Sequence, residues 1–179
     1  MVELACHPGV SSRALRGVTA RATRTREGRL SLHYSLHGDI DKLLIPAPQP
    51  ARIGWKLWRH TCCEAFIRPQ PGDAYYEFNF SPSGEWAAYA FSGYRQGAPL
   101  ADPALDPQIA IERNAETLEL YALVPLSRLA IHGPLRLALS AVVEEQDGNI
   151  SYWALHHPAA RPDFHHADSF SLNLDEVRD

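Results

Sequence analysis

The sequence lacks long hydrophobic runs, low-complexity tracts and clusters of charge of one sign. No stretch of about 18 apolar residues is present, so no segment has the length and hydropathy of a membrane-spanning helix. Lys and Arg number 17 and Asp and Glu number 21, a net charge of -4, and no segment gathers the basic residues. Because nucleic acids and anionic membranes bind basic patches, neither is expected as a partner.

Cysteine is also scarce, and the three present are Cys6, Cys62 and Cys63. Their number is odd, and the adjacent pair does not readily form an unstrained disulfide. The first residues carry no basic segment followed by an apolar one, which is the usual export signal. These features predict a protein of the reducing cytoplasm. The length of 179 residues suits one well-cored domain, expected to span 1–179.

What the sequence does contain is hydrophobic alternation with a period of two, whereas long stretches with the helical period of about 3.6 are missing. Residues 125–130 are long enough for one helical turn, and residues 48–58 form a loop or an irregular crossing. So many short strands, bounded by Gly, Pro, Asn or Asp, predict an all-β fold, either a sandwich or a barrel. The ten predicted strands are residues 14–24, 29–38, 62–69, 74–81, 85–94, 108–115, 117–125, 135–145, 150–157 and 169–174.

Turn positions then predict which side chains share a face of a sheet. If the turn at 81–84 pairs Phe80 with Glu85, Asn79 lies opposite Trp86. We therefore expect a mixed face of acids, an amide, an arginine and aromatics on this hairpin and on the strand before it. Its members, if the residues between them face the core, are Glu64, Phe66, Arg68, Tyr75, Glu77, Asn79 and Trp86.

A second hairpin leads to the histidine-rich stretch near the C-terminus. If the turn at 146–149 pairs Glu145 with Ile150, Val142 lies opposite Trp153, and Trp153 points away from the core. The predicted core row of the strand before this turn is Leu135, Leu137, Leu139, Ala141 and Val143.

Two histidine pairs bracket the loop that follows, residues 158–164. His156 and His157 face opposite sides of their strand, so the pair does not chelate a metal while the strand lasts. His157 lies on the same side as Trp153. The two prolines of the loop restrict its backbone, which predicts a fixed rim beside the Trp153 face.

Residues 57–97, LWRHTCCEAFIRPQPGDAYYEFNFSPSGEWAAYAFSGYRQG, carry a recognisable pattern. A Trp precedes a Cys-Glu-x-Phe-Ile strand, a Tyr-x-Glu-Phe strand follows, and then Ser-Pro-Ser-Gly with an aromatic shortly after it. The pattern resembles the superfamily of DOMON-like domains and family-nine carbohydrate-binding modules, and residues 152–174 are similar to the end of small bacterial DOMON-like proteins. The resemblance covers residues 15–175 and implies an immunoglobulin-like or jelly-roll antiparallel β-sandwich with a sugar or a haem against one sheet.

The resemblance also implies which residues hold a ligand. In the sugar-binding relatives, tryptophans and polar side chains on the concave sheet contact the sugar, since an aromatic ring stacks on its apolar face and polar groups fix its hydroxyls. The leading hypothesis is a non-catalytic module for a small polar or saccharide ligand, without a cofactor. For the tryptophans, the alternative is packing in the core. The candidate ligand-binding residues are Trp58, Glu64, Asn79, Trp86, Arg95, Trp153 and His157.

Two alternatives come from other classes of protein. Haem-binding relatives use an axial Met with His or Lys, and the sequence has no Met beyond Met1, so the usual haem pair is absent. A redox module with haem or a divalent metal would have to use histidines. A glycoside-acting enzyme would use Glu64 and Glu77 as its acid and nucleophile. The histidines available to the redox module are His60, His157, His165 and His166, of which the last three are the candidate metal ligands.

Overall fold

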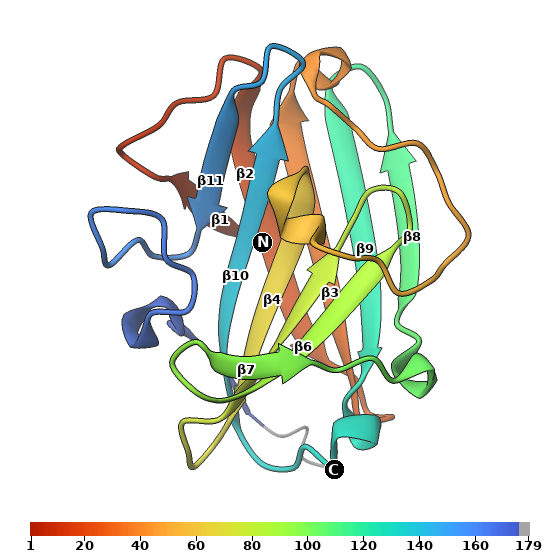
Figure 1. Ribbon diagram of the computed structural model, residues 1–179, viewed down its shortest axis with the longest axis vertical. Coiled ribbons are helices and arrows are strands. Elements are labelled where there is room, and N and C mark those ends of the chain that lie inside the picture. The colour runs from red at the N-terminus through yellow and green to blue at the C-terminus, as the bar shows by residue number, and fades with distance from the viewer. Residues whose placement is uncertain (176–179) are drawn as a thin grey trace.

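The alternating residues of the sequence form antiparallel strands in the computed structural model, which describes residues 1–175 (Figure 1). Residues 176–179, the end of the predicted domain, lie outside the described residues. The predicted all-β fold is confirmed. The strands are β1 Val2–Cys6, β2 Leu15–Arg24, β3 Arg29–Gly38, β4 Cys62–Pro69, β5 Tyr75–Phe80, β6 Trp86–Gly93, β7 Gln96–Pro99, β8 Gln108–Arg113, β9 Thr117–Pro125, β10 Leu135–Glu144, β11 Ile150–Ala154 and β12 Leu172–Leu174.

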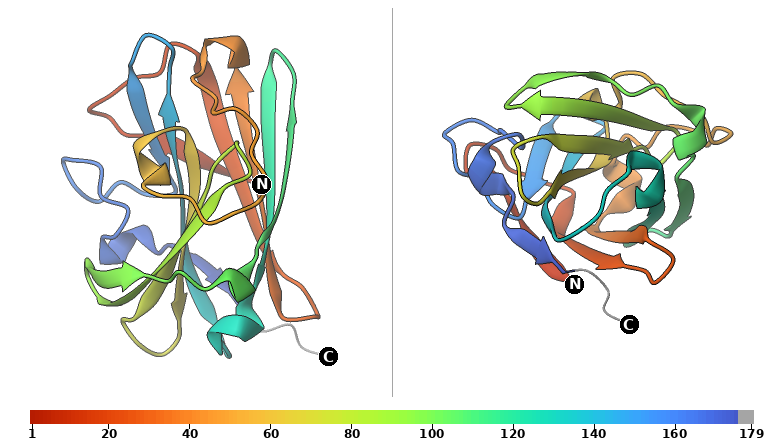
Figure 2. Two further views of the ribbon diagram at one scale, coloured as in Figure 1. Left: turned by 45° about the vertical axis from the view of Figure 1, so that its right-hand side comes forward. Right: turned by 90° about the horizontal axis from the view of Figure 1, so that it is seen from below.

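Two layers of strands pack face to face as a β-sandwich (Figure 2). The large sheet has the strand order β7-β6-β5-β4-β10-β11, and the small sheet has the order β2-β3-β9-β8. β1 joins the two sheets, because Leu4 pairs with Val18 of β2 while Ala5 pairs with Ala154 of β11. β12 pairs with β10 and extends the large sheet.

The core lies between the sheets and is built from one face of each. In β10, the predicted core row is confirmed, because Leu135, Leu137 and Leu139 are almost completely buried. Each such leucine contributes about 1.5 to 3 kcal/mol by leaving water. β4 differs, since seven of its eight residues are buried, on both faces. The face of β4 that points away from the core is therefore also covered by other parts of the chain.

β1 and β7 are strands that the sequence did not predict. The four residues of β7 are all exposed, so pairing with β6 defines this strand rather than hydrophobic alternation. β1 has five residues and divides its pairing between two sheets, which no local pattern indicates. The other ten strands overlap the ten predicted segments.

Helical structure is limited to short 3-10 turns in the described part of the chain. One lies within the predicted turn at 125–130, and another lies at the end of the 48–58 loop. No helix among residues 1–175 is long and apolar enough to cross a membrane. The turns are η1 Ile40–Lys42, η2 Leu57–Arg59, η3 Pro103–Leu105, η4 Leu126–Leu129 and η5 Ala167–Ser169.

The predicted register of the β5–β6 hairpin is wrong by one residue. The Ser81 N–H donates to the Glu85 carbonyl at 2.9 Å, and the Gly84 N–H donates to the Ser81 carbonyl at 2.9 Å. Gly84 has a φ of 95°, the left-handed conformation that closes a three-residue hairpin loop. Phe80 therefore pairs with Trp86, and a shift of one residue moves a side chain to the other face.

The β10–β11 hairpin has the same type of turn, and its predicted register is also wrong by one residue. The Glu145 N–H donates to the Asn149 carbonyl at 2.8 Å, and Gly148 has a φ of 84°. Ala141 consequently pairs with Trp153. Trp86 and Trp153 thus face the core, at 2% and 7% exposure, and the prediction that they lie on the ligand face is wrong.

Candidate ligand-binding cleft

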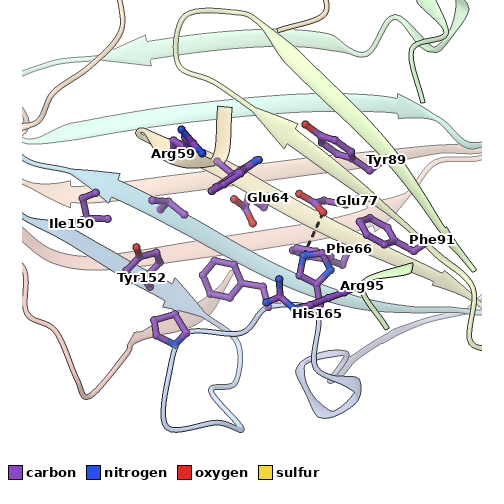
Figure 3. Close-up of a pocket in the computed structure, with 14 residues that line it drawn as sticks. Arg59, Glu64, Phe66, Glu77, Tyr89, Phe91, Arg95, Ile150, Tyr152 and His165 are labelled. Carbon is purple, nitrogen blue, oxygen red and sulfur yellow. Dashed lines mark ion pairs between the residues drawn. The ribbon is translucent and has the colours of Figure 1, made fainter. Parts of the chain in front are cut away.

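The outer face of the large sheet carries a cleft over the centre of the sheet. One row of paired residues crosses five strands, from β6 through β5, β4 and β10 to β11. Glu64, in the middle of this row, lines the cleft. The cleft has a volume of about 660 Å³ (Figure 3). The row consists of Ala87, Asn79, Glu64, Ser140 and Ala154.

Aromatic side chains from several elements form the walls of the cleft. Tyr89 and Phe91 come from β6, Tyr152 comes from β11, and Phe164 comes from the loop before η5. Trp58 lies in η2 and remains 43% exposed. These rings approach the cleft from different sides, so a bound molecule would meet aromatic surface on more than one face (Figure 3).

Two carboxyl groups lie at the floor of the cleft. Glu64 on β4 is 3% exposed and Glu77 on β5 is 6% exposed. Burial raises the pKa of Glu77 to about 7, although the Asn79 side-chain N–H, which donates to Glu77 Oε1 at 2.8 Å, and the Arg95 charge favour the ionised form. Burial and the neighbouring Glu77 raise the pKa of Glu64 well above its ordinary value. The pair therefore retains protons near neutral pH.

A neutral histidine stands beside the carboxyls. His165 Nε2 lies 3.7 Å from Glu77 Oε2 (Figure 3). On its other side, His165 Nδ1 lies 2.9 Å from the Tyr75 hydroxyl. Burial, together with the Arg95 charge, lowers the pKa of His165 to about 4. The imidazole is therefore uncharged near neutral pH and does not compensate the charge of an ionised Glu77.

The rim of the cleft contains the cations. The Arg95 guanidinium is paired with Asp163, at 2.8 Å, and the Tyr94 hydroxyl donates to the same carboxylate at 2.7 Å. The Arg59 guanidinium lies 5.1 Å from the centre of the Trp58 ring. The loop that contains Asp163 also brings Phe164 and His165 to the cleft, so it does form part of the rim.

The structure brings together only some of the predicted ligand-binding residues. Trp58, Glu64 and Arg95 line the cleft. Asn79 lies on the same face but is buried and contacts Glu77, while Trp86 and Trp153 belong to the core. Three other wall aromatics were not predicted from the sequence, and the observed hairpin registers place them on this face: Tyr89, Phe91 and Tyr152.

The candidate metal ligands have separate partners. His157 Nε2 lies 2.8 Å from the Ala5 carbonyl oxygen, His166 Nδ1 accepts the Asp168 N–H at 3.2 Å, and His165 contacts Tyr75. His60 Nδ1 lies 2.7 Å from Glu144 Oε2. Over residues 1–175, no three His, Cys, Asp or Glu side chains are grouped so that they could hold a metal ion.

Comparison with known proteins gives structural but not sequence matches. No protein-family model and no curated protein matches the sequence. The fold is similar to a "putative carbohydrate-binding protein" from Bacteroides uniformis, with a TM-score of 0.68 and 18% identity over 97% of this chain and 86% of that chain. It is also similar to a family-nine carbohydrate-binding module from Caldicellulosiruptor kristjanssonii.

The structure of that module in complex with glucose has a TM-score of 0.56 and 10% identity, over 99% of this chain and 86% of the module. The structure in complex with cellotriose has a TM-score of 0.52 and 10% identity, over 97% and 82%. At these identities the comparisons show the fold, a β-sandwich like that of the family-nine modules. The DOMON part of the sequence resemblance stays a prediction.

Proposed function

We propose that the protein is a non-catalytic binding module whose cleft holds a saccharide. One observation carries this proposal: aromatic walls enclose buried polar groups in a cleft on the outer face of one sheet. The similarity of the fold to a module determined with glucose and with cellotriose supports the same proposal.

The size and chemistry of the cleft suit a sugar. Its volume of about 660 Å³ lies within the range of about 300 to 1,000 Å³ that is usual for small-molecule sites. The exposed Trp58 ring offers a flat surface for the C–H face of a sugar ring. Glu64 and Arg95 can accept from and donate to sugar hydroxyls, which would fix the orientation of the ring.

Two tryptophans of one loop provide the matched test. Trp58 lines the cleft, whereas Trp55, three residues earlier and 68% exposed, does not. In calorimetric titrations with glucose and cellotriose, we expect Trp58→Ala to weaken binding by about 1 to 3 kcal/mol, as for a stacking aromatic at a hot spot. Trp55→Ala should bind as the native protein does. Absence of binding to any mono- or oligosaccharide of a broad panel would contradict the proposal.

A glycoside-acting enzyme is the second candidate function. The pairing of two buried carboxyls with raised pKa values in one cleft favours it, because glycoside hydrolysis uses one protonated and one ionised carboxyl. Glu64 and Glu77 project from neighbouring strands of the same sheet, however, and a hydrolase requires them on either side of the scissile bond. Release of reducing sugar from oligosaccharides, abolished by Glu64→Gln, would favour the enzyme.

We also propose a reducing, cytoplasmic location and binding without a cofactor. Cys6, Cys62 and Cys63 are free thiols, which supports the first part. The second part follows from the cleft, where side chains alone offer the stacking surface and the polar groups. Absorbance and metal analysis of the purified protein would detect a haem or a stoichiometric metal.

A further inference from the structure

Glu64 is a buried carboxyl that lines the cleft and has no cation beside it. Its side chain is 97% removed from solvent, since the residue is 3% exposed, and it forms no ion pair with any residue among 1–175. A buried carboxylate without a cation is costly, because water solvates the charge better than protein does. Burial therefore favours the protonated carboxyl in the free protein, and a cation supplied by a ligand would favour the ionised form.

The surroundings of Glu64 contain further buried oxygens. Asn79 pairs with Glu64 on one side and Ser140 pairs with it on the other. Asn79 Oδ1 is buried and has no hydrogen-bond partner, whereas the buried Ser140 hydroxyl interacts with the Glu64 carboxyl and favours its ionised form. With Glu77 on the adjacent strand, the floor gathers acceptor oxygens and lacks a permanently charged donor.

The arginines near the cleft form no ion pair with Glu64 or Glu77, although the Arg95 charge acts on Glu77 from the rim. Arg95 is committed to Asp163 at 2.8 Å, and the Arg59 guanidinium lies 5.1 Å from the Trp58 ring centre. His165 is near Glu77 but is uncharged near neutral pH. Figure 3 shows the Glu64 and Glu77 carboxyls between Tyr152 on one side and Tyr89 and Phe91 on the other.

An ammonium group matches this environment. It carries one positive charge and three N–H donors, and it needs acceptors such as carboxylate, amide and hydroxyl oxygens. Aromatic faces attract the same group through their negative quadrupole. A neutral sugar hydroxyl would use the acceptors but would not favour the ionised form of either carboxyl.

Building on the proposed saccharide-binding function, we propose that the cleft selects saccharides that carry a free amino group, with the ammonium placed between Glu64 and Glu77. The unpartnered, buried Glu64 and the aromatic walls define this specificity together. An acetylated amine lacks the charge and should bind no better than the corresponding hydroxyl sugar.

Protons should leave the protein when such a ligand binds. Glu77, with a pKa of about 7, is partly protonated at neutral pH. The titratable and polar groups that interact with it are Glu64, Asn79, His165, Arg95, Tyr75, Tyr89 and Cys62. A ligand ammonium favours the ionised carboxyls, so binding should release protons and affinity should rise with pH while the amine stays protonated.

Calorimetric titrations at pH 7 with glucosamine, N-acetylglucosamine, glucose and 2-aminoethanol test the proposal. We expect glucosamine to bind at least about tenfold more tightly than glucose, which one additional charged hydrogen bond supports. Repeating the titration in buffers of different ionisation enthalpy should reveal proton release for glucosamine and none for glucose. 2-Aminoethanol should bind more weakly than glucosamine, because it lacks the ring that stacks on the walls.

Variants distinguish an effect of the Glu64 carboxyl on binding from a loss of the fold. Glu64→Gln should remove the advantage of glucosamine while glucose binding persists, and Glu112→Gln, an exposed acid on β8, should change neither. If Glu64→Gln does not fold, the proton release of the native protein decides. Equal affinity for glucose and glucosamine would overturn this inference alone, whereas absence of binding to every sugar would overturn the saccharide function as well. Equally tight binding of 2-aminoethanol would show an amine site without saccharide specificity and would also overturn the inference.

Discussion

The outer face of each sheet carries a glutamate with a histidine and a tyrosine nearby, but the two clusters differ in burial and in the distance between glutamate and histidine. On the small sheet, Glu119 accepts a hydrogen bond from the Ser35 hydroxyl at 2.6 Å and lies 2.7 Å from His33 Nε2, and Tyr121 stacks on His33 at 4.3 Å. On the large sheet, Glu77 also has a histidine and a tyrosine nearby. There, however, the carboxyl is buried and the histidine is 3.7 Å away.

The comparison distinguishes a surface cluster, whose polar groups are paired within the protein, from a buried cluster whose carboxyls have no cationic partner. Glu119 is partly exposed and close to its partners, so its carboxylate is compensated without help. Glu64 and Glu77 are withdrawn from water, and burial raises the pKa of both. A glutamate, a histidine and a tyrosine in proximity therefore do not define a site, whereas burial without a compensating partner does.

The largest expected effect comes from Trp86, which the structure places under the large sheet rather than in its cleft. Trp86→Ala should lower the free energy of unfolding by about 3 to 5 kcal/mol, because it leaves a large cavity in the core. Denaturant titration measures this loss. A loss below about 1 kcal/mol would mean that Trp86 is a cleft residue and that the hairpin register is the one first predicted.

The pH dependence of stability should distinguish Glu77 on the large sheet from Glu119 on the small sheet. The pKa of Glu77 rises from 4.5 to about 7 on folding, so the folded state binds this proton more tightly than the unfolded state. Glu77 therefore contributes stability below pH 4.5, and this is lost as the pH rises to about 7, by about 3 kcal/mol. His165, whose pKa falls to about 4, contributes the opposite trend over much of this range, so the Glu77 contribution is measured as the difference between the native protein and a Glu77 variant in unfolding titrations.

Substitution of Glu77 tests whether this carboxyl causes that contribution to the pH dependence. Because no carboxyl remains at this position to titrate, the stability of Glu77→Gln should fall less, or rise more, between pH 4.5 and about 7 than that of the native protein. Glu119→Gln should leave the pH dependence in place. An unchanged slope in Glu77→Gln would mean that the carboxyl is solvated like a surface residue.

The smallest effect is expected on the small sheet. Glu119→Gln should cost about 1 kcal/mol of stability, the usual net value of a hydrogen bond, since His33 remains partly solvated. In contrast, Glu64→Gln should leave stability unchanged or raise it at pH 8, because it removes a buried carboxyl whose pKa rises on folding and which therefore costs stability above its ordinary pKa. Thermal unfolding of Glu119→Gln and Glu64→Gln measures both effects. A clear loss of stability in Glu64→Gln would contradict the claim that the Glu64 carboxyl has no cationic partner in the protein.

Alternation within single strands made most of the fold predictable. The apolar rows of β10 and the pairing of β4 with β5 follow from it, and this pairing places Glu64 and Glu77 on one face. The turns were harder, because the parity of the loop decides which face each side chain occupies. The loop with Gly28, where the Thr25 N–H donates to the Arg29 carbonyl, has the same form, so glycine in the left-handed region is the signal to use.

Other parts of the site depend on contacts between distant segments. β1 connects the two sheets through pairs with both β2 and β11, and Phe164 and His165 reach the cleft from an irregular loop. No local periodicity encodes such contacts. Trp58 and Arg95 were found through a family pattern, not through geometry, and the cytoplasmic location inferred from the cysteines stays a prediction.

The most direct test of the central claim is a map of amide chemical-shift changes in the protein as glucose and glucosamine are added. The account predicts shifts in the amides of Tyr89, Phe91, Tyr152 and His165, which surround the cleft, and none around Glu119 on the small sheet. It also predicts larger shifts at Glu64 and Glu77 with glucosamine than with glucose. Shifts confined to the outer face of the small sheet, or no shifts with any saccharide, would contradict it.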